Sequence, residues 1–207
     1  MSKPLSHSEE FLELDVESTL ESKIDNPSGY PIPWVYQRRT SRSPVVLLID
    51  TSFSMTGFKL VMAGTVTATL ARLVPMPDLC IIGFSKHPYD VKRFDEDIAP
   101  YHLIARVLKL TPRGYTNIAQ ALKVGRKLIT DFPFDSKLIL LSDSEPTSGP
   151  NPFVEASKLP SLDILLFPGG NEWVAKRLTL EARKGKLLKL SKLSLIPQAL
   201  QTIFCSS

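Results

Sequence analysis

The chain of 207 residues has only two cysteines, Cys80 and Cys205, which is too few for a disulfide framework or a cysteine-rich zinc fold. It also lacks any apolar run of the roughly 18–20 residues that a membrane-spanning helix needs. Residues 1–20 contain no apolar segment of the kind found in secretory signals. We therefore expect a cytoplasmic protein without a membrane partner.

Histidine and glycine are scarce as well, with three and ten residues respectively. The histidines are too scattered to form a metal-ligand set or a catalytic triad: His7, His87 and His102. The low glycine content and the helical periodicity argue against an aspartic protease, although Asp50-Thr51-Ser52 is similar to its catalytic loop. Neither a Walker A motif nor a Gly-x-Ser-x-Gly elbow is present. We do not expect an enzyme.

The formal net charge of +4 is too small to indicate nucleic-acid binding. Basic residues nevertheless gather between residues 176 and 192, where a solvated face of a helix and an edge strand is the ordinary interpretation. A surface for an acidic or nucleic-acid partner is the alternative. The basic residues of this region are Lys176, Arg177, Arg183, Lys184, Lys186, Lys189 and Lys192.

The first 43 residues differ in composition from the remainder. Acidic residues dominate up to Asp25, and the segment 26–33 is rich in the proline, glycine and asparagine of turns. We interpret residues 1–43 as an N-terminal extension that wraps a domain of residues 44–207. A partly disordered tail is the alternative.

From residue 44 onward, continuous apolar runs alternate with helical patterns. Apolar runs without polar alternation are typical of strands buried on both faces, as in a parallel sheet. Alternation of strands and helices predicts an α/β fold with a doubly wound, mostly parallel central sheet and helices on both faces, as in Rossmann-like proteins. We expect strands at 45–49, 79–84, 89–94, 138–141, 162–167 and 186–190, and helices after Gly57 and at 98–110, 118–129, 172–180 and 197–204.

Oxygen-bearing side chains follow two of these strands. Asp50, Ser52 and Ser54 come directly after the first buried strand, and Asp143 follows the fourth. A chain reversal before the helix at residue 118 can bring Thr116 to the same place. Because ligand sites of such sheets lie outside the carboxyl ends of the strands, we expect all five side chains to meet there.

This set of donors suits a hard divalent cation. Mg²⁺ takes about six oxygen ligands and gives up its waters reluctantly, so hydroxyls and carboxylates with retained water suit it, and Mn²⁺ can substitute. The lack of histidine and cysteine argues against zinc and copper. The alternative is that Ser54 and Thr116 only cap helices or form turns, as such residues often do.

The pattern Asp50-x-Ser52-x-Ser54, then Thr116, then Asp143 resembles the metal-ion-dependent adhesion site (MIDAS) of von Willebrand factor A (VWA) domains. The resemblance covers roughly residues 44–204. Phe53 and Ser144 depart from the family, which usually has glycine at the first position and frequently has it at the second.

The resemblance implies an intracellular metal-dependent protein–protein interaction module with a regulatory or complex-assembly role. The five residues named above would hold the ion, and a carboxylate of a partner protein would fill its open position. Phe53, Tyr115 and Glu145 would then contact the partner beside the metal.

The extension carries a second resemblance. Asp15-Val16-Glu17-Ser18-Thr19-Leu20, followed by an arginine-rich run into the first strand, is similar to intracellular VWA proteins that work with MoxR-type AAA+ ATPases. This implies such an ATPase or its client as the partner. One enzymatic alternative is a metal-dependent phosphohydrolase that uses Asp50 as nucleophile, although such enzymes usually have an acid where Ser52 stands.

Overall fold

The computed structural model describes residues 2–4, 13–15, 34–36, 43–130, 132 and 136–205. The chain divides into two compact units, Met1–Ser41 and Arg42–Ser207. In the first unit, β1 (Ser2–Pro4), β2 (Glu13–Asp15) and β3 (Trp34–Tyr36) form an antiparallel sheet in the order β1-β3-β2. The expected boundary after residue 43 and the wrapping of the domain stay predictions, because most of this segment lies outside the described ranges.

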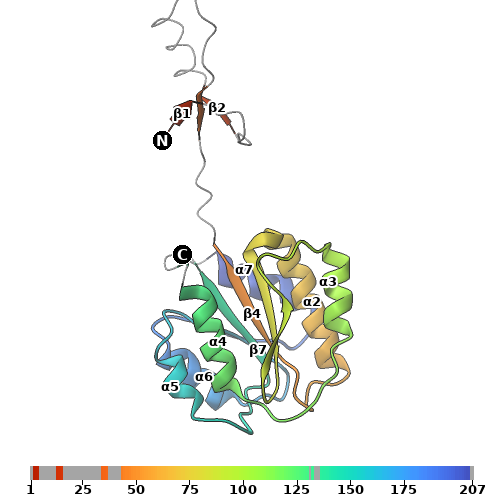
Figure 1. The fold of residues 1–207 in the computed structure, drawn as a ribbon. Helices are drawn as coiled ribbons and strands as arrows, with labels where there is room; N and C mark the ends of the chain where they lie inside the picture. The colour runs from red at the N-terminus through yellow and green to blue at the C-terminus, as the bar shows by residue number, and fades with distance from the viewer. Residues whose placement is uncertain are drawn as a thin grey trace, which may run out of the picture. The chain divides into compact units, whose positions relative to one another are not determined.

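The second unit is built on a six-stranded sheet with the order β6-β5-β4-β7-β8-β9 (Figure 1). All neighbouring strands are parallel except β5 and β6, which are antiparallel. The first strand of this unit therefore lies inside the sheet, between strands that come later in the chain. The strands are β4 (Val45–Asp50), β5 (Leu79–Phe84), β6 (Pro88–Lys92), β7 (Lys137–Ser142), β8 (Asp163–Leu166) and β9 (Leu187–Lys189).

Helices cover both faces of the sheet, and alternate residues of β4 contribute to a core on each face. Val45, Leu47 and Ile49 belong to the core under one set of helices, and Val46 and Leu48 to the core under the other. The first set is α2 (Phe58–Leu73), α3 (Pro100–Leu108) and α7 (Ile196–Phe204); the second is α4 (Ile118–Thr130), α5 (Pro152–Ala156) and α6 (Glu172–Glu181).

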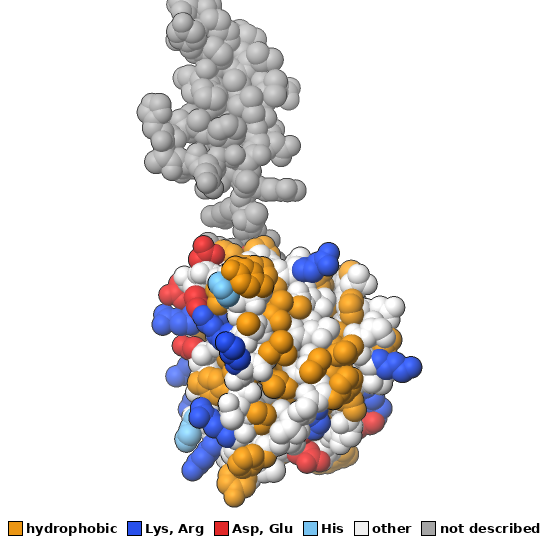
Figure 2. Space-filling view, turned by 90° about the vertical axis from the view of Figure 1, so that its right-hand side faces the viewer, with side chains coloured by type: hydrophobic (Ala, Val, Ile, Leu, Met, Phe, Trp, Pro, Cys, Tyr) orange, Lys and Arg blue, Asp and Glu red, His pale blue; other side chains and the backbone are white. Residues whose placement is uncertain are grey.

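Helix α2 carries unusually little charge for a helix at the surface. Lys59 and Arg72, near its two ends, are its only charged residues. Figure 2 looks onto the side of α2 and α3, where hydrophobic side chains are widely visible between the charged ones. The large exposed apolar side chains of these two helices are Phe58, Val61, Leu73, Tyr101 and Leu108.

The doubly wound α/β fold predicted from the sequence is confirmed, and β5 begins and ends at the predicted residues. The short helix α5 was not expected. It consists of five residues, begins at Pro152, and is capped by Asn151, whose side chain accepts a hydrogen bond from the Phe153 N–H. Within the described part of the chain, no helix is long and apolar enough to cross a membrane.

Candidate metal centre

Asp50 ends the interior strand β4 and is fully buried. Its Oδ1 accepts a hydrogen bond from the Ser52 N–H at 2.9 Å, and its Oδ2 accepts one from the Ser142 hydroxyl at 2.6 Å. Burial raises the pKa of this carboxyl to about 6; these hydrogen bonds lower it, and the nearby charge of Asp143 raises it further. Asp50 is thus held in place by neutral donors only.

The two serines after β4 lie together, with their hydroxyl oxygens 3.1 Å apart. Ser52 is buried and Ser54 is exposed. Neither caps the following helix, because α2 begins after Gly57, and no side chain hydrogen-bonds to its first turn. A helix cap at Ser54 is therefore wrong, whereas the alternative of a turn residue is confirmed, because Ser54 lies in the turn that the Met55 N–H closes on the Ser52 carbonyl at 2.9 Å.

The loop before α4 lies against the loop after β4. The Arg113 N–H donates to the Thr51 carbonyl at 2.8 Å, and the Phe53 N–H donates to the Gly114 carbonyl at 3.3 Å. Gly114 has a φ of 72°, in the left-handed region that glycine favours, which allows the chain to reverse here. These contacts bring the segment containing Thr116 to the carboxyl edge, as expected.

Thr116 is buried, and its main chain is fixed by the segment that follows β7. Its N–H donates to the Thr147 hydroxyl at 2.8 Å, and its carbonyl accepts the N–H groups of Thr147 and Ser148. The capping of α4 is performed by Asn117, whose Oδ1 accepts the Gln120 N–H. The hydroxyl of Thr116 has no hydrogen-bond partner within the described ranges, so the alternative of a cap is wrong here too.

Asp143 follows β7, the strand that pairs with β4. Its Oδ2 forms an ion pair with the Lys59 Nζ at 2.8 Å. Its Oδ1 is buried and has no hydrogen-bond partner among the residues that the structure describes. A buried carboxylate oxygen without a partner lowers the stability of the folded protein, so this atom is a candidate to bind a ligand.

The donors at this edge fit a hard cation. The described residues include no group of three or more His, Cys, Asp or Glu that could hold a metal ion, so a centre at this edge would need hydroxyl ligands beside its two carboxylates. The unpartnered oxygen of Asp143 and the paired hydroxyls of Ser52 and Ser54 are donors of the type that Mg²⁺ and Mn²⁺ prefer.

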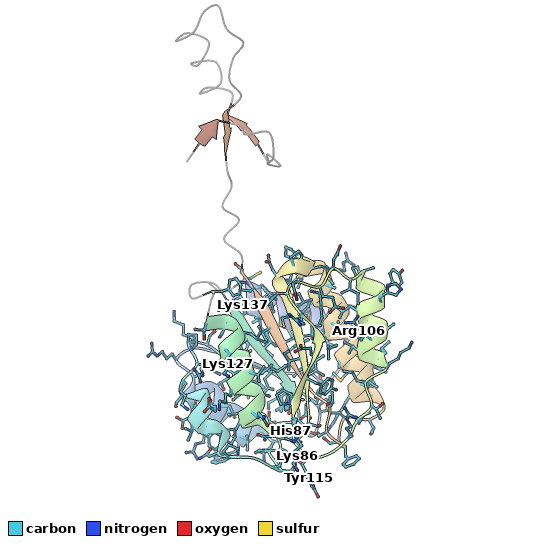
Figure 3. The ribbon with its side chains drawn as sticks, in the orientation of Figure 1. Lys86, His87, Arg106, Tyr115, Lys127 and Lys137 are labelled. Atoms are coloured by element: carbon cyan, nitrogen blue, oxygen red, sulfur yellow. The ribbon has the colours of Figure 1, made fainter. Side chains whose placement is uncertain are left out.

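Two aromatic side chains flank these donors. Phe53 is 69% exposed and Tyr115 is 63% exposed, although both belong to loops that are fixed to each other. In Figure 3, Tyr115 points away from the domain at the edge where Lys86 and His87 also lie. Glu145 is exposed and takes part in no ion pair within the described part of the chain.

Two residues around the candidate centre were not anticipated from the sequence. Lys59 comes from the first turn of α2, and its position on an otherwise nearly uncharged helix is the signal that could have found it. Ser142 precedes Asp143 and links both carboxylate segments, because its hydroxyl donates to Asp50 and accepts the Ser144 N–H at 2.9 Å.

The basic region 176–192 is partly engaged within the domain. The Arg177 guanidinium lies 4.3 Å from the ring centroid of Phe153 and 5.4 Å from that of Trp173. Lys189 forms an ion pair with Glu172 at 2.6 Å. These contacts favour the interpretation as a solvated surface, and binding of an acidic or nucleic-acid partner stays an untested alternative.

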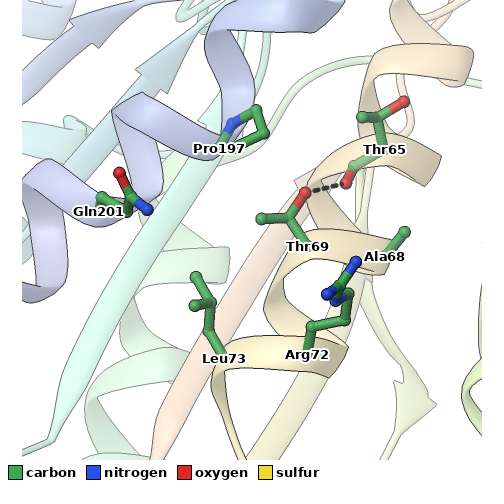
Figure 4. Close-up of a pocket in the computed structure, with 7 residues that line it drawn as sticks. All are labelled: Thr65, Ala68, Thr69, Arg72, Leu73, Pro197 and Gln201. Carbon is green, nitrogen blue, oxygen red and sulfur yellow. Dashed lines mark hydrogen bonds between the residues drawn. The ribbon is translucent and has the colours of Figure 1, made fainter.

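A cavity of about 410 Å³ lies between α2 and α7, away from the candidate centre (Figure 4). Its walls include Thr65 and Thr69, joined by a hydrogen bond of 2.9 Å from the Thr69 hydroxyl to the Thr65 carbonyl, and Pro197 and Gln201 of α7. The lining contains no carboxylate, histidine or cysteine, so it offers no alternative metal centre.

Comparison with known proteins connects this geometry to a family. The sequence matches the family model described as "VWA domain containing CoxE-like protein" over residues 5–158. No curated protein matches the chain. Among solved structures, a von Willebrand factor type A protein from Catenulispora acidiphila is similar with a TM-score of 0.68 and 13% identity, over 78% of this chain and 42% of that one.

Two further solved structures share the fold. The conserved hypothetical protein BatB from Bacteroides thetaiotaomicron has a TM-score of 0.63 and 15% identity, over 79% of this chain and 99% of that one. Proximal thread matrix protein 1 from the mussel byssus, solved with a zinc occupied MIDAS motif, has a TM-score of 0.62 and 16% identity, over 78% of this chain and 47% of that one. The chain thus spans less than half of the Catenulispora and mussel proteins.

Proposed function

Because the chain belongs to the family of VWA domain containing CoxE-like proteins, we propose that it is a metal-dependent protein–protein interaction module. A divalent cation bound at the carboxyl edge of the sheet accepts a carboxylate from a partner protein. The role is regulation or assembly of a complex rather than catalysis. A phosphohydrolase is disfavoured because Ser52 stands where its second acid would be needed.

The observation that carries this proposal is the buried, unpartnered Oδ1 of Asp143 in the same cluster as the paired serine hydroxyls. Mg²⁺ is the proposed ion, with Mn²⁺ as a substitute; when bound, it supplies an electrophilic position for one more anionic oxygen. The chain's own residues hold the ion and position the loops around it. The proposed ligands are Asp50, Ser52, Ser54, Thr116 and Asp143.

The rim of the centre indicates the chemistry of the partner. The exposed rings of Phe53 and Tyr115 offer apolar contact, and Lys86 offers positive charge at the same edge. We therefore propose a partner segment in which an acidic side chain is flanked by large apolar residues, with Glu145 at the outer boundary. A MoxR-type AAA+ ATPase or its client is the proposed partner class, and a cytoplasmic location stays a prediction.

Thermal unfolding with and without Mg²⁺ tests the metal centre. A cation that binds only the folded protein stabilises it by about 2.7 kcal/mol at a hundredfold excess over Kd. Asp50→Ala should abolish this stabilisation, whereas Asp163→Ala, which removes a buried aspartate at the start of β8, should retain it. An equal response of the wild type and Asp50→Ala would refute the assignment.

Capture of a candidate MoxR-type ATPase by the wild type and by Asp50→Ala, each in Mg²⁺ and in EDTA, tests the interaction. The proposal expects capture only by the wild type in Mg²⁺. Equal capture in all four conditions would move the interaction away from the metal, and the basic region 176–192 would become the leading surface.

A further inference from the structure

We propose that Lys59 is a built-in counter-cation of the metal centre, which weakens the binding of the divalent ion and leaves positive charge for the carboxylate of a partner. This inference rests on the proposed function, because it concerns the same site. It assigns a role to a residue outside the five proposed ligands.

The contact between Lys59 and Asp143 joins two elements that are distant in sequence. Lys59 lies in the first turn of α2, and its Nζ is 2.8 Å from the Asp143 Oδ2. The Lys59 side chain is 23% exposed and that of Asp143 only 4%. Because water screens such a shielded pair less than a surface pair, the ammonium exerts a strong field on the centre.

Lys59 contacts only one of the two carboxylate oxygens of Asp143. Lys59 uses Oδ2 of the carboxylate, and Oδ1 stays buried and without a partner in the described part of the chain. The ammonium thus fixes the carboxylate through one oxygen and leaves the other for a cation. It accompanies the divalent ion instead of replacing it.

The formal charges show the consequence. Asp50 and Asp143 contribute two negative charges, and a divalent cation alone would bring the centre to zero. With the ammonium of Lys59 the loaded centre carries one net positive charge, which attracts an incoming carboxylate. The cost is repulsion between the ammonium and the divalent ion, so the empty centre binds the ion less tightly than two bare carboxylates would.

Titration with Mn²⁺, followed by the loss of the free-ion signal in electron paramagnetic resonance, measures this effect. Lys59→Gln keeps a donor for Asp143 and removes the charge, so it should bind Mn²⁺ roughly tenfold more tightly than the wild type. Lys59→Arg keeps the charge and should stay within about threefold. The melting temperature in EDTA should fall in Lys59→Gln, because the ion pair is lost while metal binding improves.

The outcomes separate this inference from the proposed function. If the wild type binds Mn²⁺ and Lys59→Gln binds it equally or more weakly, the counter-cation role is wrong and the metal centre stands. If Lys59→Gln and Lys59→Arg both bind more tightly, charge is not the cause and the inference is overturned. If neither the wild type nor Lys59→Gln binds Mn²⁺, the metal centre itself is wrong and the inference falls with it.

Discussion

Buried charged groups lie at both ends of the sheet, and their surroundings differ. At one end, the ammonium of the buried Lys92 donates to three carbonyls, those of Met76, Leu79 and Arg93, at 2.7–2.9 Å. At the other end, Asp143 has one oxygen in an ion pair and one without a partner. Leu79 begins β5, the strand whose far end pairs with Asp50, so the two clusters are separated by the length of a strand.

The difference separates a buried charge whose hydrogen bonds are all made from one that has an unpartnered atom. The three protons of an ammonium are all used at Lys92, and nothing remains for a ligand. The cluster at the carboxyl edge has donors and acceptors in excess of its internal bonds, because Asp143 Oδ1 and the Ser144 hydroxyl are both buried and unpartnered among the described residues. Unsatisfied buried groups cost stability, so their presence favours a function in binding.

The largest expected effect comes from removing the ammonium of Lys92, whose hydrogen bonds are all made. Lys92→Met keeps the apolar stem but removes three hydrogen bonds from a charged donor, each contributing about 1.5–3 kcal/mol. The carbonyls of Met76 and Arg93 each keep one N–H donor, from Leu79 and Glu96. We expect a loss of about 4 kcal/mol in the free energy of unfolding, measured with urea, and an unchanged stabilisation by Mg²⁺. A loss below about 1 kcal/mol would show that water or another donor replaces the ammonium.

The next effect concerns Asp50 and pH. Its pKa is raised from 3.8 to about 6 in the folded, metal-free protein, so between these values the folded state holds the proton more firmly than the unfolded state. This contribution stabilises the protein fully below pH 4 and is lost as the pH rises through 6, by about 3 kcal/mol in all.

Urea unfolding in EDTA between pH 4 and 7 measures this contribution as the difference between the wild type and Asp50→Asn, because other carboxyls titrate in both. The free energy of unfolding of the wild type, relative to that of Asp50→Asn, should decrease as the pH rises from 4 to 7. Parallel profiles would show that the Asp50 carboxyl titrates alike in the folded and unfolded states.

The smallest expected effect comes from Ser144, at the carboxyl edge where buried polar atoms lack partners. Ser144 has a φ of 57°, which strains a residue with a side chain, and its buried hydroxyl has no partner in the described part of the chain. Ser144→Gly should stabilise the protein by about 1 kcal/mol, because glycine adopts this backbone conformation without strain. The N–H to the Ser142 hydroxyl is retained, so Mn²⁺ affinity should not change. A destabilised variant would mean that the hydroxyl has a partner when the protein is in solution.

The strands and most helices follow from the sequence because each is encoded locally. The run 79–84 is apolar throughout and forms β5, and the periodic segment from Ile118 forms α4. The ligand candidates could be ordered along one edge because parallel strands end together. The pairing of Lys59 with Asp143 could not be predicted, since it depends on the packing of α2 beside the end of β7. The enclosure of Lys92 could not be predicted either, because its partners are main-chain carbonyls that surround it only once β6 has paired with β5.

The interior position of β4 has a consequence for how the protein is made. Its neighbour β5 follows soon in the chain, but β7 comes much later, and 92 residues separate Asp50 from Ser142. At the pace of translation this is a delay of roughly 5–20 s. During that interval the apolar β4 has one edge uncovered and Asp50 lacks the hydroxyl that fixes it, so the proposed metal centre cannot be assembled in a nascent chain until β7 has left the ribosome.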